Sequence, residues 1–138
     1  MTAPFVDTNV LIRFLTGDDL QQQAAAARLL QQVERGALTV AAPDTVIADA
    51  VFVLASRRLY NLPRAQIQAL LTPLMRLPHF HVQNRRMLLR ALAIFGDTVR
   101  LDFGACCILA GMEQAGATTV YSFDRDFDGI AGIVRVEP

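Results

Sequence analysis

The chain has 138 residues, of which 53% are hydrophobic and 19% charged, and its formal net charge is zero. A chain of this length buries roughly two thirds of the surface that it exposes when unfolded, so one domain spanning residues 1–138 is expected. This composition excludes an intrinsically disordered protein. No apolar run reaches the roughly 18 residues that a membrane helix needs, and the N-terminus lacks the features of a signal peptide. We therefore expect a cytoplasmic protein without membrane contact.

The charge is unevenly distributed along the chain. Residues 50–96 contain seven arginines and no acidic residue, whereas residues 1–49 carry a net charge of −3 and residues 97–138 a net charge of −4. Every basic residue is an arginine, whose planar guanidinium group suits bidentate contacts with phosphates. The basic middle indicates a nucleic-acid surface. A solvated helical face is the alternative, and a coding bias also explains the absence of lysine.

The N-terminal part of the chain alternates apolar segments with helical patterns. It opens with a short apolar strand, breaks at Asp7-Thr8-Asn9 and resumes with helical spacing. Residues 18–35 have high helix propensity, start at acidic capping residues and stop at Gly36, which predicts a helix. Residues 37–43 predict a buried strand. A helix is then expected from Asp44 or Thr45 to about residue 59.

The C-terminal part continues this alternation. Pro63 is placed to start a helix that Pro73 interrupts, and residues 80–82 predict a short strand. Two further helices are expected, the first closed by Gly96 and the second running from Asp102 until Gly116 ends it. The segment TTVYSF and the final IVRV predict the last two strands. Strands that alternate with helices in this way favour an α/β fold with a mainly parallel sheet covered on both faces.

Three aspartates stand where this fold would place a ligand site. Asp7 and Asp124 each follow a predicted strand, and ligands of parallel α/β sheets bind at the carboxyl ends of strands. Asp49 interrupts the apolar run VIADAVFVLA inside a helix. Carboxylates gathered there repel one another unless a cation joins them, and Mg²⁺ or Mn²⁺ is the cation that oxygen ligands favour. Taken singly, each aspartate is explained equally well as a turn former or a solvated helix residue.

Four segments of the sequence resemble the landmarks of PIN-domain proteins of the VapC type, which are toxin ribonucleases. These segments are FVDTNVLI, VIADAVFVL, LDFGACCILAGMEQAGA and VYSFDRDFDGIAGI, and together they span nearly the whole chain. The resemblance implies a three-layer sandwich around a mainly parallel central sheet. It also implies a single PIN-like nuclease domain that cleaves RNA with Mg²⁺ or Mn²⁺.

Carried over by position, the resemblance implies that Asp7, Asp49 and Asp124 are the metal-binding and catalytic residues. The family usually has Glu in place of Asp49, so a shorter side chain must reach the same metal. Four neighbouring polar residues match supporting positions of the family: Thr8, Asn9, Ser122 and Asp126.

One position departs from the family pattern. Where relatives have a further metal-binding aspartate, this chain has Ala105, in the segment Asp102-Phe103-Gly104-Ala105. Removing one of about four carboxylates is expected to disable the site or weaken it. Asp102, one helical turn earlier, is either a partial substitute or only a helix cap.

The resemblance also implies partners, namely an RNA substrate, a cognate VapB-like antitoxin and a second copy in a homodimer. Arg57 and Arg58 are the preferred RNA-binding residues because they follow Asp49 by about two turns on the same predicted helix.

Two other classes of protein and one other kind of metal site remain alternatives on the sequence alone. The main alternative is a non-catalytic PIN-like binding module, which Ala105 favours. A haloacid-dehalogenase-like phosphotransferase requires a second aspartate where Asn9 stands. A zinc site at His79 and His81 lacks a third ligand.

Overall fold

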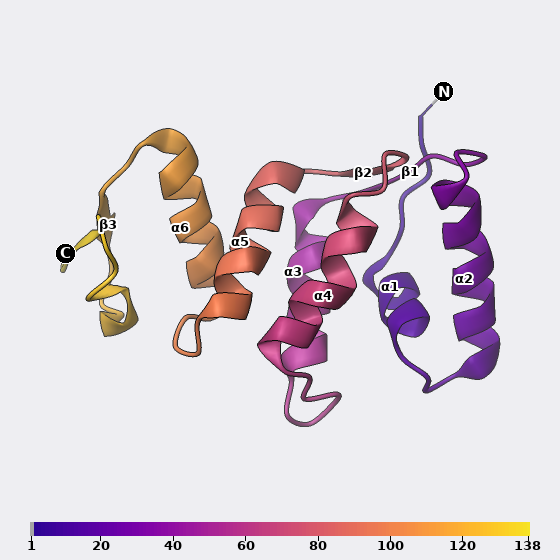
Figure 1. The fold of residues 1–138 in the computed structure, drawn as a ribbon, viewed down its shortest axis with the longest axis horizontal. Helices are drawn as coiled ribbons and strands as arrows, with labels where there is room; N and C mark the ends of the chain where they lie inside the picture. Colours follow the sequence, from indigo (N-terminus) through magenta and orange to yellow (C-terminus); the bar gives the residue numbers. More distant parts are fainter. Residues whose placement is uncertain (1) are drawn as a thin grey trace.

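The computed structural model describes residues 2–138 and shows an α/β protein. Figure 1 shows the helices side by side, with α1 and α2 at one end, α3 and α4 in the middle, and α5 and α6 toward the other end. The helices are α1 (Thr8–Leu15), α2 (Leu20–Glu34), α3 (Asp44–Ala55), α4 (Arg64–Met75), α5 (Arg85–Asp97) and α6 (Phe103–Ala115). The shorter elements are β1 (Val40–Ala42), β2 (Phe80–Val82), β3 (Thr119–Tyr121), β4 (Val134–Val136) and the 3-10 turn η1 (Arg125–Phe127). No described helix has the length and apolar character to cross a membrane.

A small parallel sheet lies above the N-terminal and central helices. β1 pairs in parallel with β2, with Val40 opposite Phe80 and Ala42 opposite Val82. Residues 4–6 add a third parallel segment on the other side of β1, because the amide of Val6 donates to Ala41 O and the amide of Ala41 donates to Pro4 O. Asp7 therefore stands directly at the carboxyl end of this edge segment.

The core lies between the sheet and the helices and is apolar throughout. Among residues 2–138 no polar or charged residue is buried. Each helix contributes one buried stripe, as the spacing of apolar residues predicts. The largest fully buried side chains include Leu11 of α1, Ile47 and Leu54 of α3, Ile67 and Leu71 of α4, Phe80 of β2, and Leu88 and Leu92 of α5.

The C-terminal strands form a second, separate sheet, in which β3 pairs in parallel with β4. Figure 1 shows β3 beyond α6, at the opposite end of the molecule from α2. The parallel strand direction agrees with the sequence-based expectation, whereas the structure has two small two-stranded sheets where a single central sheet was expected. β3 and β4 are each three residues long, so their pairing supplies few backbone hydrogen bonds.

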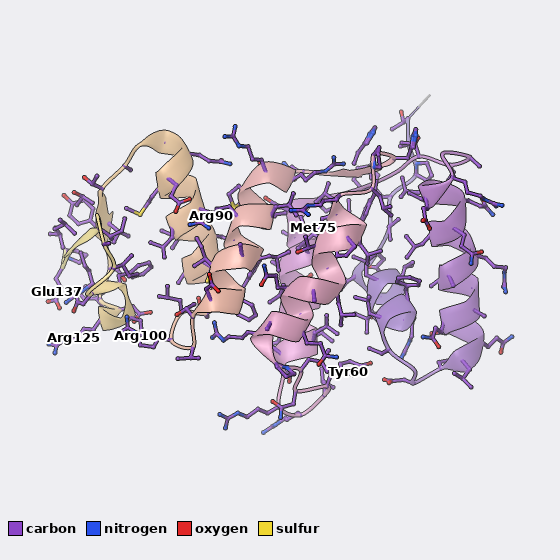
Figure 2. All side chains as sticks on the ribbon, in the orientation of Figure 1. Tyr60, Met75, Arg90, Arg100, Arg125 and Glu137 are labelled. Carbon is purple, nitrogen blue, oxygen red and sulfur yellow. The ribbon has the colours of Figure 1, made fainter. Side chains whose placement is uncertain are left out.

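Packing holds the β3–β4 unit against α5 and α6. Phe127 of η1 is only 3% exposed, and Ile130 and Ile133 pack against the core beside it. The two helices are themselves joined by a bidentate pair, Arg90 Nε to Glu113 Oε2 at 2.8 Å and a second nitrogen to Oε1 at 3.0 Å. Figure 2 shows Arg90 at this junction, and Arg100, Arg125 and Glu137 around the C-terminal unit.

Two helix boundaries differ from the sequence-based expectation. α3 ends at Ala55, because Ser56 is extended and the chain turns back, with the amide of Leu62 donating to Leu54 O. Arg57 and Arg58 therefore lie in a turn after α3 and not on it. Pro73 does not interrupt α4, which continues to Met75. It removes only one amide donor of the last turn, and its side chain is exposed.

The two neighbouring cysteines are free thiols on α6. Cys106 is buried and Cys107 half-buried, and burial raises the pKa of each thiol to about 11. Both are therefore protonated at neutral pH and act as packing residues, since the thiolate is the reactive form.

Candidate active site

Asp7 and Asp49 line one small pocket on the surface. The pocket has a volume of about 340 Å³, and we call it the acidic pocket; it is lined by Asp7, Thr8, Asn9, Asp49, Phe52 and Val53. Two helices that are not consecutive in sequence create it, because α1 packs against α3. The arrangement brings a strand-end carboxylate and a mid-helix carboxylate to the same place.

Asp7 is fixed by its position at the N-terminus of α1. Its backbone is extended, and its Oδ1 accepts a hydrogen bond of 2.7 Å from the amide of Thr8. No other hydrogen bond of the described residues reaches this carboxylate, so Oδ2 remains available for a ligand.

Asp49 lies on the exposed side of α3, between the buried residues Ile47 and Ala50. It makes no hydrogen bond or ion pair with any residue in 2–138. Its neighbour one turn later on the same face is Phe52, which is 75% exposed. Asp49 and Phe52 both line the acidic pocket, so the pocket takes one surface of α3.

Asp124, the third carboxylate that the sequence indicated, is not among the residues that line this pocket. It follows β3 on the distant C-terminal unit (Figure 1). There it caps η1, since its Oδ1 accepts from the amide of Asp126 at 2.9 Å, and its own amide donates to Ser122 Oγ at 2.9 Å. Ser122 and Asp126 therefore order the loop around Asp124, which is exposed.

Asp102 and Ala105, at the start of α6, each have a local structural role. Asp102 is the N-cap of α6, and its Oδ1 accepts from the amide of Ala105 at 2.8 Å. Ala105 is 6% exposed and belongs to the hydrophobic core. Neither residue lines the acidic pocket. The helix-cap interpretation of Asp102 accounts for the geometry seen here.

The donors of the acidic pocket suit a small hard cation. Within residues 2–138, no group of three or more His, Cys, Asp or Glu side chains is placed to hold a metal ion. Mg²⁺, however, is commonly bound by one or two carboxylates together with waters and substrate phosphates. The two carboxylates of the pocket and the side-chain oxygens of Thr8 and Asn9 match that donor chemistry, with one carboxylate fewer than the sequence led us to expect.

The structure divides the basic middle of the chain into two groups. Three arginines bind internal partners: Arg64 donates to Leu101 O, Arg85 donates to Phe80 O, and Arg90 pairs with Glu113. The other four are exposed and make no ion pair within residues 2–138; they are Arg57, Arg58, Arg76 and Arg86. These four guanidinium groups are therefore free of internal partners among the described residues and are the first candidates for a phosphate-binding surface.

A larger groove borders the acidic pocket. This lateral groove of about 700 Å³ runs between α3, the turn after it, the C-terminal end of α5 and the start of α6. Phe52 lines both cavities, and Arg57 lines the groove. Phe52 belongs to no sequence motif of the site, although its spacing of three residues from Asp49 indicates a shared helix face.

These features define a small α/β protein with a carboxylate pocket at the end of a parallel strand segment. The family model for the PIN domain matches residues 5–133, which is nearly the entire chain. The chain therefore belongs to the PIN domain family. No curated protein matches the chain significantly. PIN domains are generally nucleases, so membership supports a hydrolytic activity on nucleic acid.

Proposed function

We propose that this protein is a divalent-metal-dependent endoribonuclease of the VapC toxin type, weakened by Ala105. The observation that carries the proposal is the shared pocket of Asp7 and Asp49 in a chain of the PIN family. Asp7 and Asp49 would hold Mg²⁺ or Mn²⁺, with Thr8 and Asn9 beside them. When bound, such an ion lowers the pKa of water and neutralises charge on a scissile phosphate.

The protein's own residues would bind and position the RNA. Two acidic side chains alone repel a phosphate, so productive binding needs basic groups next to the pocket. Arg57 in the lateral groove and the adjacent Arg58 supply two guanidinium groups. Phe52, at the border of pocket and groove, offers an exposed ring on which a base can stack. RNA lying along the groove would then present its backbone to the carboxylates.

Cleavage of a mixed RNA pool tests this proposal. Cleavage is expected with Mn²⁺ or Mg²⁺, is expected to stop on addition of EDTA, and should fall at least tenfold in Asp49→Asn, because the amide lacks the charge that holds the cation. Asp44→Asn is the matched control, since Asp44 lies on the same helix but outside the acidic pocket. EDTA-resistant cleavage, or equal loss in both variants, would contradict the proposal.

Replacing both Arg57 and Arg58 with Ala is expected to weaken RNA binding and to flatten its salt dependence by about one counterion unit per lost phosphate contact. Fluorescence anisotropy of a labelled RNA at several salt concentrations measures both effects. Arg86→Ala serves as the control, because Arg86 is also exposed but lies at the start of α5. If the double variant kept the salt slope of the original chain, these arginines would belong to a solvated surface.

The non-catalytic binding module is the second candidate, and one observation favours it. Ala105 is packed in the core, where the family pattern has a ligand. Such a module would bind RNA or a protein at the lateral groove without metal-dependent cleavage. The absence of cleavage at any divalent metal concentration, with RNA binding retained, would decide for it.

The toxin role, a VapB-like antitoxin and a homodimer are parts of the same proposal. They rest on the resemblance of four segments to VapC-type proteins. The lateral groove is a suitable place for an antitoxin segment, because it is largely apolar and leads to the acidic pocket. An arginine of such a segment would pair with Asp7 and Asp49.

A further inference from the structure

The lateral groove has the size and the lining of a pocket for a flat ring. Its volume of about 700 Å³ is that of an ordinary small-molecule pocket. Most of its lining is apolar and includes the aromatic side chains of Phe52 and Phe103, and a few polar side chains, among them Arg57 and Asp102, interrupt the apolar walls. A heteroaromatic ring with polar groups on its edge suits such a lining.

The carboxylate of Asp102 has one oxygen in use and one free. Asp102 is exposed and lines the lateral groove at the start of α6. Its Oδ1 accepts the capping hydrogen bond from the amide of Ala105, whereas its Oδ2 accepts none from any residue in 2–138, and Asp102 forms no ion pair there. Because a carboxylate oxygen only accepts hydrogen bonds, Oδ2 selects a partner that carries a donor.

Asp102 is also held in a fixed position. The preceding residue, Leu101, is bound by Arg64 at the start of α4, whose Nη1 donates to Leu101 O. The guanidinium carbon of Arg64 lies 4.3 Å from the centroid of the Phe95 ring, and Phe95 meets Phe103 edge to face with the ring centroids 5.8 Å apart. Figure 1 shows the loop from α5 to α6, which these contacts hold at the lower end of both helices. A preorganised acceptor loses little freedom on binding and therefore discriminates well between ligands.

Gly104 leaves space beside this acceptor. It lies in the first turn of α6 and lines the lateral groove, although glycine is a poor helix residue. A Cβ at this position would have Asp102 Oδ1 as a neighbour, at 3.5 Å. The absence of a side chain at position 104 therefore keeps Asp102 open to a group that lies in the groove.

Three groups of the lateral groove correspond to the three parts of a nucleotide. The ring of Phe52, which is 75% exposed, offers a stacking surface to the face of any base. Arg57 offers a guanidinium group to a phosphate. The free oxygen of Asp102 offers an acceptor to the edge of the base. A base can reach such a site only when it is unpaired.

We propose that an unpaired base with an amino group enters the lateral groove, stacks on Phe52 and donates a hydrogen bond from its amino group to Asp102 Oδ2. Cytosine, adenine and guanine carry an amino group, whereas uracil carries only carbonyl oxygens as exocyclic groups, and these are repelled by a carboxylate oxygen. Asp102 thus determines base specificity. The inference rests on the RNA binding of the proposed function and adds the kind of base that the RNA must present.

Binding of two oligoribonucleotides tests this inference without any measurement of cleavage. Oligomers of cytidine and of uridine, equal in length, differ at the base edge in the amino group that replaces a carbonyl oxygen. Their affinities are measured by fluorescence anisotropy at neutral pH in EDTA. The cytidine oligomer is expected to bind about tenfold more tightly, which is the usual effect of one hydrogen bond to a charged group. Equal affinities, or a preference for uridine, would overturn the proposal.

Asp102→Asn removes the preference while keeping the helix cap. Asn and Asp cap helices about equally well, so thermal unfolding should be unchanged. The amide of Asn donates as well as accepts, so the two affinities should come within about twofold of each other. Asp97→Asn is the matched control, because Asp97 is an exposed carboxylate at the end of α5 that does not line the lateral groove. Loss of the preference in both variants, or in neither, would overturn the proposal.

Two further variants separate stacking from recognition of the base edge. Phe52→Ala should weaken binding of both oligomers by roughly fivefold or more and keep their ratio, because stacking tolerates any base. Gly104→Leu fills the space beside Asp102 with a good helix former, so it should remove the preference without lowering stability. If both variants bound RNA as the unmodified chain does, the groove would serve another occupant, such as the antitoxin segment, and the proposal would be wrong.

The cleavage assay with Mn²⁺ distinguishes failure of this inference from failure of the nuclease proposal. A chain that prefers cytidine but cleaves no RNA would refute the nuclease and leave the role of Asp102 standing. A chain that cleaves RNA but binds both oligomers equally would refute the role of Asp102 and leave the nuclease standing. A chain that binds neither oligomer would also overturn the inference.

Discussion

Replacing Ala105 with Asp is expected to destabilise the metal-free protein and, with Mn²⁺ present, to increase both metal affinity and RNA cleavage. Ala105 is 6% exposed among apolar side chains, so a carboxylate there is removed from water without a partner. Such burial costs on the order of 3 kcal/mol of the free energy of unfolding. A cation that binds only the folded state contributes about 2.7 kcal/mol at a concentration one hundred times its Kd, which offsets most of that loss.

Thermal unfolding with and without Mn²⁺, together with cleavage of an RNA pool, measures this outcome. Ala105→Asn is the matched control, since it introduces a polar group of the same size without the charge, and its unfolding should not depend on Mn²⁺. If Ala105→Asp were equally unstable with and without Mn²⁺, then position 105 would belong to the core alone. If the unmodified chain cleaved RNA as fast as the variant, Ala105 would not be the residue that lowers the activity of the site.

Phe127→Ala is expected to lower the free energy of unfolding by about 3 to 5 kcal/mol, which is the usual loss for a buried phenylalanine. Phe127 is 3% exposed and is the main apolar anchor of the β3–β4 unit. The lost contacts should loosen this unit as well as the core. Chemical denaturation measures the stability, and amide hydrogen exchange of β3 and β4 measures the loosening.

Phe52→Ala provides the comparison for this prediction. Phe52 is 75% exposed, so its removal should change stability by no more than about 0.5 kcal/mol. Equal effects of the two substitutions would show that Phe127 does not anchor the C-terminal unit. Burial of Phe127 would then not explain why β3 and β4 lie apart from the first sheet.

Much of the local structure could be predicted from sequence, because its causes are local. Asp19 caps α2, Gly116 ends α6 in the left-handed conformation, and the strands at 80–82 and 134–136 lie where the apolar runs predict them. The end of α3 could not be predicted in the same way. The residues directly after Ala55 are compatible with a helix, and the chain turns there through a backbone hydrogen bond from the amide of Leu62 back to Leu54 O.

Only part of the candidate site could be predicted from the sequence, because the rest depends on how separate elements pack together. The order of the elements brings Asp7 and Asp49 to one place, because α1 packs on α3 within the same half of the chain. Asp124 follows β3, and the place of this short strand depends on how Phe127 packs into the core, which a local sequence pattern does not specify. Likewise, the core position of Ala105 depends on how α6 packs against α5, which the spacing of apolar residues does not specify.

Binding of Mn²⁺ measured by calorimetry tests the central claim, that Asp7 and Asp49 form a metal site, most directly. The account predicts a weak, saturable binding event in the unmodified chain that is lost in Asp7→Asn and in Asp49→Asn and retained in Asp44→Asn. Binding of equal strength in all four proteins, or none in the unmodified chain at millimolar Mn²⁺, would contradict it.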